Sequence, residues 1–237
     1  MLIIQPEIQV ENYDGIKIMK NIERACRTCY RSEGLITEDS YKKLLKNCIN
    51  RGHESILEHE KITIRMICDI GVYKDLTRHR FGSFSIESTR YCNYSKDKFE
   101  NNIKFIKPIF YVNSWQIANY EGEAMTEEEQ KSSAWYNCME EIEDTYNFMA
   151  GLGSTPDELR MLLPHSTAAE VTMTANIREW RHILGLRCSK AAHPAIRQLL
   201  IPLLLKFKED MPELFDAIDY DIDFPKEKYA KLSIIND

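Results

Sequence analysis

The segment from Arg78 to Arg90, RHRFGSFSIESTR, concentrates side chains that bind anions. Its thirteen residues include three arginines, one histidine and three serines but one carboxylate, although the whole chain has a formal net charge of −6. Guanidinium groups bind phosphate oxygens bidentately, and hydroxyl and turn N–H groups add donors. We therefore expect the segment to bind a phosphorylated small molecule. A surface network of salt bridges is the structural alternative for the same arginines.

A second cluster lies between Gly52 and Glu60, where two histidines, three acids and a serine occupy nine positions. His53, Glu58 and His59 are residue types that bind metal ions, but their spacing is not HExxH and no further ligand set is evident. We predict no metal site. A metal-dependent phosphohydrolase that uses these three side chains is a distant alternative.

The amino-acid composition limits the classes of protein to which the chain can belong. The 237 residues are 43% hydrophobic, which is sufficient for a large core, and 31 basic against 37 acidic residues argue against nucleic-acid binding. Residues 1–6 do not resemble a leader peptide, and no run approaches the roughly 18 apolar residues of a membrane span. We expect a cytoplasmic protein that binds neither membrane nor nucleic acid.

The seven cysteines are an odd number and are scattered along the chain, which is unlike a secreted disulfide framework. Most are expected to be buried thiols. Cys26 and Cys29 form a single CxxC pair within a helical pattern, so packing is favoured over a redox or zinc role.

Hydrophobic periodicity and capping residues predict the elements that position these clusters. Helices are expected over 16–30, 40–51, 72–80, 127–151, 156–163, 177–188 and from 194 onward, and strands over 2–10, 61–69, 89–94 and 168–174. Residues 105–112 are apolar but interrupted by Pro108, which suits an edge strand or an irregular connection. The arginine-rich segment would then begin on the last turn of a helix, pass through a loop from Gly82, and end in a strand.

Four motifs in order resemble those of the flavin-dependent thymidylate synthase family. The pattern Arg-His-Arg, two residues, Ser, four residues, Ser, one residue, Arg is matched at every fixed position by Arg78–Arg90. The others are Gly52–His59, Arg160–Pro164 and Asn176–Arg187, and the resemblance spans roughly residues 15–215. It implies an α/β (α+β) fold with a mixed central sheet flanked by long helices. A single domain with helical excursions would cover residues 1–237, with a peripheral tail at about 218–237.

The resemblance implies reductive methylation of dUMP to dTMP. The one-carbon donor would be 5,10-methylenetetrahydrofolate, released as tetrahydrofolate, and FAD would carry electrons from NADPH. Because reduced flavin can supply hydride, the chemistry needs no activated cysteine, and Cys92 and Cys188 would be bystanders. A flavin- or nucleotide-binding module without turnover is the competing interpretation.

The resemblance also implies roles for individual residues. Arg187 would be catalytic, stabilising negative charge at N3 and O4 of the uracil. The expected dUMP-binding residues are Asp75, Arg78, Glu87, Ser88, Thr89, Arg90, Arg160 and Arg187. The expected FAD-binding residues are His53, Ser55, Glu58, Arg78, His79, Arg80, Asn176, Arg178 and His182.

Two positions depart from the family pattern. Family members often carry Gln at the position of Asp75 and Glu near Ile86, so the acid that contacts the site is either Glu87 or Asp75. A carboxylate at position 75 would repel a nucleotide phosphate unless Arg78 neutralises it.

On an ideal helix Arg178 and His182 lie about 40° apart, whereas Arg178 and Arg187 lie about 180° apart. One helix cannot easily direct both arginines at one ligand. Together with the family resemblance to homotetramers, this predicts active sites shared between subunits.

Overall fold

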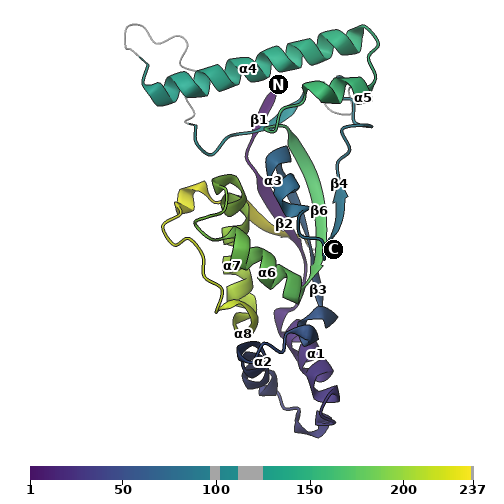
Figure 1. The fold of residues 1–237 in the computed structure, drawn as a ribbon, viewed down its shortest axis with the longest axis vertical. Helices are drawn as coiled ribbons and strands as arrows, with labels where there is room; N and C mark the ends of the chain where they lie inside the picture. Colours follow the sequence, from purple (N-terminus) through teal and green to yellow (C-terminus); the bar gives the residue numbers. More distant parts are fainter. Residues whose placement is uncertain (97–101, 112–124, 236–237) are drawn as a thin grey trace. The chain divides into compact units, whose positions relative to one another are not determined.

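The computed structural model describes residues 1–96, 102–111 and 125–235, which form two compact units (Figure 1). Unit 1 comprises residues 1–6, 67–73 and 86–170, and unit 2 comprises residues 7–66, 74–85 and 171–237. Val112, the last residue of the apolar segment 105–112, lies outside the described residues. The single domain over residues 1–237 stays a prediction.

The larger sheet has the strand order β4-β6-β3-β2-β7, formed by Ser83–Ile86, Ala168–Asn176, Lys61–Asp69, Glu7–Glu11 and Lys231–Ile235. Strands β2 and β7 are parallel, with Glu7 opposite Lys231. Strands β3 and β6 are antiparallel, because the Thr63 and Thr174 hydroxyls lie 2.8 Å apart while the Ile177 N–H donates to the Glu60 carbonyl. The predicted mixed sheet is therefore confirmed, and the C-terminal tail contributes its edge strand β7.

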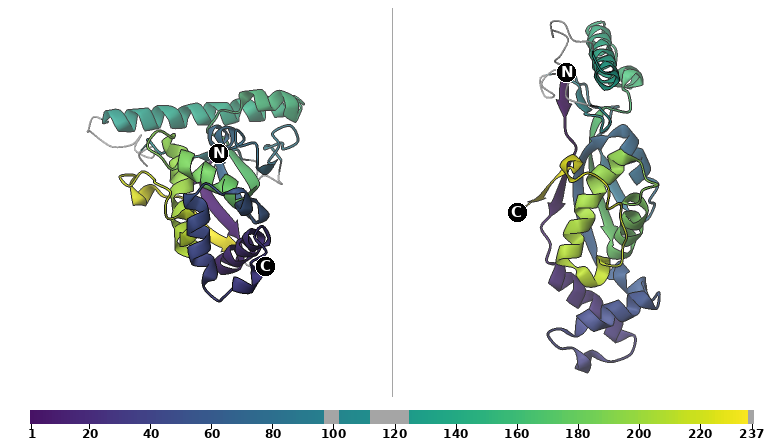
Figure 2. Two further views of the ribbon diagram at one scale, coloured as in Figure 1. Left: turned by 60° about the horizontal axis from the view of Figure 1, so that its bottom comes forward. Right: turned by 90° about the vertical axis from the view of Figure 1, so that its left-hand side faces the viewer.

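Unit 2 contains helices α1 (Gly15–Thr28), α2 (Ser40–Asn50), α6 (Ile177–Arg187), α7 (Pro194–Asp210) and α8 (Pro212–Phe215). Asp14 and Asn176 start α1 and α6, since each side chain accepts a hydrogen bond from a backbone N–H three residues on. Figures 1 and 2 show α6 and α7 side by side against the sheet. None of the helices in the described ranges is long and apolar enough to cross a membrane.

Helix α6 is fixed to the sheet by Trp180. The indole is fully buried, and its N–H donates to the Ile62 carbonyl at 3.0 Å. The ring also makes an edge contact with Phe207 of α7, at 6.2 Å between centroids. A buried indole both contributes apolar area and needs a partner for its N–H. Trp180 therefore sets the position of α6, which carries several residues of the candidate site.

The arginine-rich segment differs from the prediction. Helix α3 (Ile70–Leu76) begins two residues earlier than expected, because the Asp69 carboxylate accepts from the Val72 N–H, and it ends before Arg78. The prediction that Arg78 lies on its last turn is wrong.

The arginine-rich segment contains the strand β4, Ser83–Ile86, at positions where a loop was predicted. Its alternation of serine with an apolar residue is a strand pattern that the motif interpretation overlooked. The predicted strand over 89–94 is wrong, because the carbonyl of Ser88 accepts from the N–H groups of Tyr91 and Cys92 in a turn.

Unit 1 contains the parallel pair β1 (Leu2–Ile4) and β5 (Lys104–Ile106), with helices α4 (Glu127–Gly151) and α5 (Pro156–Leu159). The predicted strand over 2–10 is two strands, one in each unit, separated by Gln5-Pro6. Both predicted capping boxes, at Thr126 and Thr155, are confirmed. The unit's core includes Phe105, Tyr146 and Leu159.

Candidate functional site

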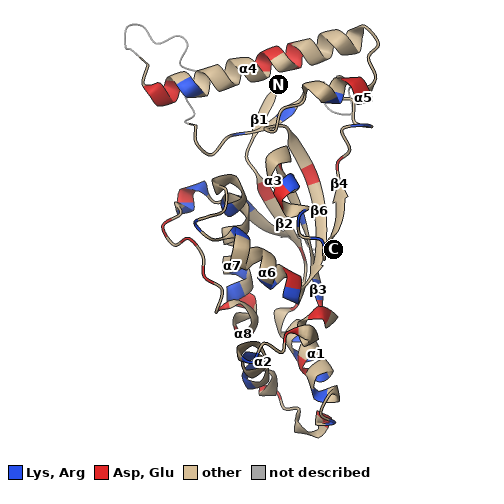
Figure 3. Ribbon diagram, viewed as in Figure 1, with Lys and Arg blue, Asp and Glu red and all other residues tan. Residues whose placement is uncertain are grey.

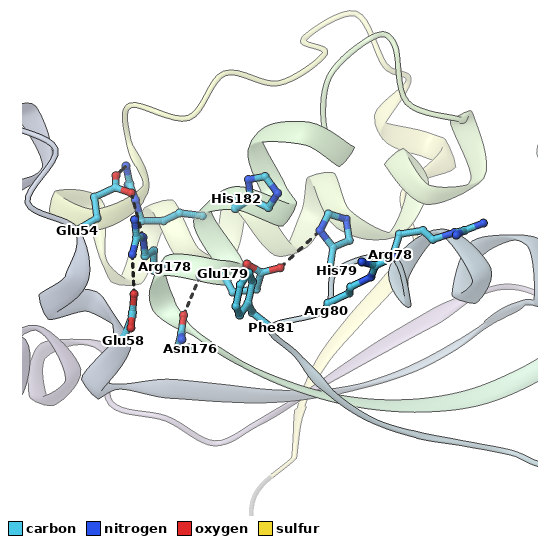
Figure 4. Close-up of a pocket in the computed structure, with 11 residues that line it drawn as sticks. Glu54, Glu58, Arg78, His79, Arg80, Phe81, Asn176, Arg178, Glu179 and His182 are labelled. Carbon is cyan, nitrogen blue, oxygen red and sulfur yellow. Dashed lines mark hydrogen bonds and ion pairs between the residues drawn. The ribbon is translucent and has the colours of Figure 1, made fainter.

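A cavity of about 750 Å³ lies in unit 2 (Figure 4). The turn after α3, the first two turns of α6 and the segment that leads into the 3-10 helix Ser55–His59 enclose it. The lining residues are Glu54, Glu58, Arg78, His79, Arg80, Phe81, Asn176, Arg178, Glu179, Arg181 and His182. Four guanidinium groups therefore face three carboxylates and two imidazoles.

Two of the arginines are paired with acids of the wall. Arg178 donates to the Glu58 carboxylate at 2.6 Å, and Arg181 donates to Glu54 at 3.3 Å. The side chains of Arg178 and Glu58 are both about half exposed, so their pair contributes at most about 1 kcal/mol to stability. A ligand phosphate can displace such a partner at modest cost.

The other two arginines of the cavity lining are Arg78 and Arg80. Both are exposed, and in the described part of the chain neither forms an ion pair. Phe81 follows them with its ring 84% exposed. Basic and acidic residues also lie side by side at the start of α6 (Figure 3). The cavity thus offers cations that no carboxylate neutralises, next to an open aromatic face.

His79 is the buried imidazole of the lining, with 5% of its surface exposed. Its Nε2 accepts a hydrogen bond from Arg187 Nε at 3.0 Å, and its Nδ1 lies 3.6 Å from Glu179 Oε1. Burial, followed by the nearby Arg187 and His182, lowers the pKa of His79 to about 4, against an opposite effect of Asp75. The imidazole is therefore neutral at pH 7.

Arg187, at the end of α6, donates hydrogen bonds to two neutral acceptors and also lies near one carboxylate. Besides His79, the Asp75 carbonyl accepts from its Nη2 at 2.9 Å, while the Asp75 carboxylate is 3.7 Å from Nη1. The cation beside Asp75 is thus Arg187, whereas Arg78 donates to Asp75 only through its backbone N–H. The sequence raised Arg78 as the group that could neutralise Asp75, and in the structure Arg187 is the arginine near that carboxylate.

The remaining predicted dUMP residues lie in unit 1. Arg90, in the turn after β4, pairs with Asp157 at 2.9 Å, and both side chains are more than half exposed. The Arg90 guanidinium, and less strongly Arg160, holds the pKa of Asp157 below its usual range. Asp157 therefore occupies the position that an anionic ligand of these two arginines would take.

Glu87 is engaged within unit 1. Its carboxylate accepts from the Tyr94 hydroxyl at 2.9 Å, and its backbone N–H donates to the Glu170 carbonyl. Ser88 and Thr89 follow it into the turn. Between the two candidate acids, Asp75 is the one in contact with Arg187, and Glu87 supports the chain at the end of β4.

The cavity brings together seven of the nine predicted FAD-binding residues, which are Glu58, Arg78, His79, Arg80, Asn176, Arg178 and His182. His53 and Ser55 are exposed and are not among its lining residues. Arg187 is likewise outside the lining, which agrees with its position on the opposite face of α6 from Arg178. Across the described ranges, no cluster of three or more His, Cys, Asp or Glu side chains forms a potential metal site.

The sequence interpretation missed Glu54, Phe81, Glu179 and Arg181 as site residues. Glu179 is the third residue after the helix cap Asn176, where an acid ordinarily signals a helix start. In the structure its carboxylate instead faces His79 (Figure 4). Its sequence position indicated only the capping role.

Residues 16–213 match the family model Thy1, described as thymidylate synthase complementing protein. The flavin-dependent thymidylate synthase of Geobacter sulfurreducens is 26% identical over 199 residues, which cover 81% of this chain and 78% of that one. The enzyme of that name from Thermosipho melanesiensis is 30% identical over 211 residues, with 89% and 87% covered.

Among solved structures, the crystal structure of the UMP/dUMP methylase PolB from Streptomyces cacaoi, bound with 5-Br dUMP, matches with a TM-score of 0.73. The match covers 92% of this chain and 96% of that chain at 21% sequence identity. At this identity the likeness shows a common fold.

Proposed function

The chain belongs to the Thy1 family and is a methyltransferase of the flavin-dependent thymidylate synthase type, and from this premise we propose that it converts dUMP to dTMP in the cytoplasm. The one-carbon donor is 5,10-methylenetetrahydrofolate, which leaves as tetrahydrofolate, and NADPH is the reductant. The observation that carries the proposal is the cavity with two unneutralised arginines beside a buried histidine and Arg187.

The cavity suits FAD by the chemistry of its donors. Arg78 and Arg80 are cations without an ion-pair partner among the described residues, and a diphosphate supplies the missing anion. Arg178 adds a third guanidinium once it leaves Glu58, and the exposed ring of Phe81 offers a face for a flat heterocycle. When bound, FAD supplies the hydride that completes the methyl group.

The nucleotide is assigned to Arg78, Arg90, Arg160 and Arg187, with Ser88 and Thr89 as further donors, Asp75 beside Arg187, and Glu87 nearby in the chain. Arg187 is the proposed catalytic residue, because a fixed cation stabilises the negative charge that develops at N3 and O4 of the uracil. Its support is the geometry of α6, where His79 and the Asp75 carbonyl hold the guanidinium. His53 and Ser55 complete the proposed FAD contacts from outside the cavity lining.

We further propose a homotetramer with active sites shared between subunits. Arg178 lines the cavity whereas Arg187 does not, so one chain presents the two arginines on different faces of α6. Mixing Arg178→Ala with Arg187→Ala, at an FAD concentration low enough that Arg178→Ala binds little cofactor, should restore partial activity, because some sites then receive both native arginines. No recovery, once subunit exchange is demonstrated with tagged chains, would count against shared sites.

Turnover by the purified chain tests the function. We expect a yellow protein with a flavin spectrum that converts dUMP to dTMP only when 5,10-methylenetetrahydrofolate and NADPH are both present. Lys131→Ala, a change on the exposed surface of α4, serves as the matched control and should turn over normally. Flavin binding without dTMP formation would instead identify a passive binding module, and colourless protein that gains no activity with added FAD would exclude the proposal.

A further inference from the structure

The hydrogen bond between Arg187 and His79 defines where the proton of His79 lies. The Nε of an arginine always carries a hydrogen and donates, and here it lies 3.0 Å from His79 Nε2. His79 Nε2 must therefore present a lone pair. In a neutral imidazole, the single proton is then on Nδ1.

The Nδ1 side of the same ring faces Glu179. The nearest carboxylate oxygen is 3.6 Å away, and Glu179 is itself buried, with 7% of its surface exposed (Figure 4). A carboxylate only accepts hydrogen bonds, so it favours the tautomer with a proton on Nδ1. This is the tautomer that Arg187 requires on the other side of the ring.

We propose that Glu179 and His79 are positioning residues for Arg187: Glu179 selects the Nδ1–H tautomer, and the free Nε2 of His79 then holds the Arg187 guanidinium. The proposal rests on the proposed function, in which Arg187 acts on the pyrimidine. It adds Glu179, to which the sequence interpretation assigned no role, and it gives His79 a role toward Arg187 besides its place in the cavity wall.

Burial, followed by the nearby Arg187 and His182, keeps His79 in the accepting form by lowering its pKa, against the opposite effect of Asp75. On α6, His182 makes an edge contact with its ring at 5.6 Å between centroids, and Arg187 and Glu179 face its two nitrogens. Asp75 of α3 is the further charged group acting on it. With a pKa of about 4, His79 does not become a second cation beside Arg187 at neutral pH.

The hydrogen bonds that orient the Arg187 guanidinium are accepted by neutral groups, while the Asp75 carboxylate lies 3.7 Å from its Nη1. His79 Nε2 and the Asp75 carbonyl are neutral acceptors that fix two nitrogens of one planar guanidinium group. A carboxylate in the place of His79 would fix the group equally well but would neutralise it. A neutral histidine is therefore the better partner for an arginine that must stabilise developing negative charge.

The tautomer can be measured without any ligand. In the chain labelled with ¹⁵N-histidine, the His79 signals are assigned by their loss in His79→Gln. We expect an unprotonated Nε2 and a protonated Nδ1 at neutral pH, persisting down to about pH 5 because the histidine pKa is lowered. An Nε2–H tautomer or a charged imidazolium at neutral pH overturns the proposal, whether or not the chain makes dTMP.

A matched pair of substitutions tests the role of Glu179. Glu179→Leu has similar volume and good helix propensity but no acceptor, whereas Glu179→Gln keeps an acceptor oxygen. We expect Leu to lower kcat/KM at least about tenfold with mixed His79 tautomers, and Gln to retain at least about fivefold more activity than Leu. A role in packing alone predicts that Leu is as active as Gln, and that result would overturn the proposal.

Failure of the proposed function and failure of the positioning role of Glu179 give different experimental results. A wild-type chain that forms no dTMP counts against the proposed function, while the tautomer measurement still tests the Glu179–His79 pair. An active chain whose Glu179→Leu variant has wild-type turnover counts against the positioning role alone. If Glu179→Leu does not fold, the tautomers of the wild type and Glu179→Gln decide: Nδ1–H in both supports the proposal, and Nε2–H in either overturns it.

Discussion

Arg187 in unit 2 and Arg90 in unit 1 are held in different ways. The side chain of Arg187 is 21% exposed; it donates hydrogen bonds to a buried histidine and a backbone carbonyl, and the Asp75 carboxylate lies 3.7 Å from its Nη1. The side chain of Arg90 is 55% exposed and donates directly to an exposed carboxylate, Asp157. The hydrogen bonds that orient Arg187 are thus accepted by neutral groups, whereas the hydrogen bond that holds Arg90 is accepted by a carboxylate that a ligand would have to replace. The first arrangement suits catalysis, and the second suits reversible binding.

The largest effect is expected from Arg187→Lys. Lysine keeps the charge but cannot reproduce donation from two nitrogens of one plane to His79 and Asp75. We expect kcat for dTMP formation to fall about 10²- to 10³-fold, the cost of removing one preorganised electrostatic group. Steady-state kinetics measure it, and a lysine variant within a few-fold of wild type would show that the held geometry is unimportant.

A pH effect on stability is expected next. In the unfolded chain His79 takes up a proton near pH 6.5, but in the folded chain only near pH 4, so the unfolded state binds more protons between these values. The stabilisation is complete above pH 6.5 and is lost as pH falls toward 4, by up to about 3 kcal/mol. Urea unfolding of wild type and His79→Gln measures this difference. Identical pH profiles of the two proteins would contradict the buried neutral histidine.

Arg178→Ala should have an intermediate effect, on cofactor binding. Arg178 must exchange Glu58 for a phosphate oxygen, so its net contribution is the difference between two charge-assisted contacts. We expect FAD affinity to fall about tenfold, equivalent to about 1.4 kcal/mol. Flavin fluorescence titration measures the affinity, with Lys131→Ala as the control. Unchanged affinity would remove Arg178 from the cofactor site.

The smallest effect is expected from Asp157→Asn. The pair with Arg90 is exposed, so the free energy of unfolding should change by less than about 1 kcal/mol. Binding of dUMP should become a few-fold tighter, because the competing carboxylate is removed, whereas Arg90→Ala should weaken it. Calorimetric titration with dUMP distinguishes tighter from weaker binding. Weaker binding by Asp157→Asn would mean that Asp157 orients Arg90 for the ligand.

The sequence was most informative where one local signal decides the structure. The strand Lys61–Asp69 is confirmed at both ends, because its alternation has one buried face, and the helix that starts at Asn176 is confirmed by its cap. The segment 78–94 was predicted poorly. There, the signature motif drew attention to charged residues, while the alternating Ser83–Ile86 formed the strand.

Local sequence patterns could not predict contacts between residues that are far apart in the sequence. Nothing near Glu179 in the sequence shows that its carboxylate meets a histidine from the turn after α3, since the fold alone brings them together. The same holds for Arg187 beside Asp75, because Arg78 was the only arginine that the sequence interpretation considered near Asp75. The residue types of the site were therefore predictable, but their partners were not.

The pairing of β2 with β7 has a consequence for biosynthesis. Glu7–Glu11 is synthesised before its parallel neighbour Lys231–Ile235, and more than 200 residues separate the two strands in the sequence. Until then one side of β2 presents unpaired backbone groups, a template for association with other nascent chains. The sheet that supports α6 is thus completed only after Lys231–Ile235 has been synthesised, and Arg187 at the end of α6 acquires its final support only then.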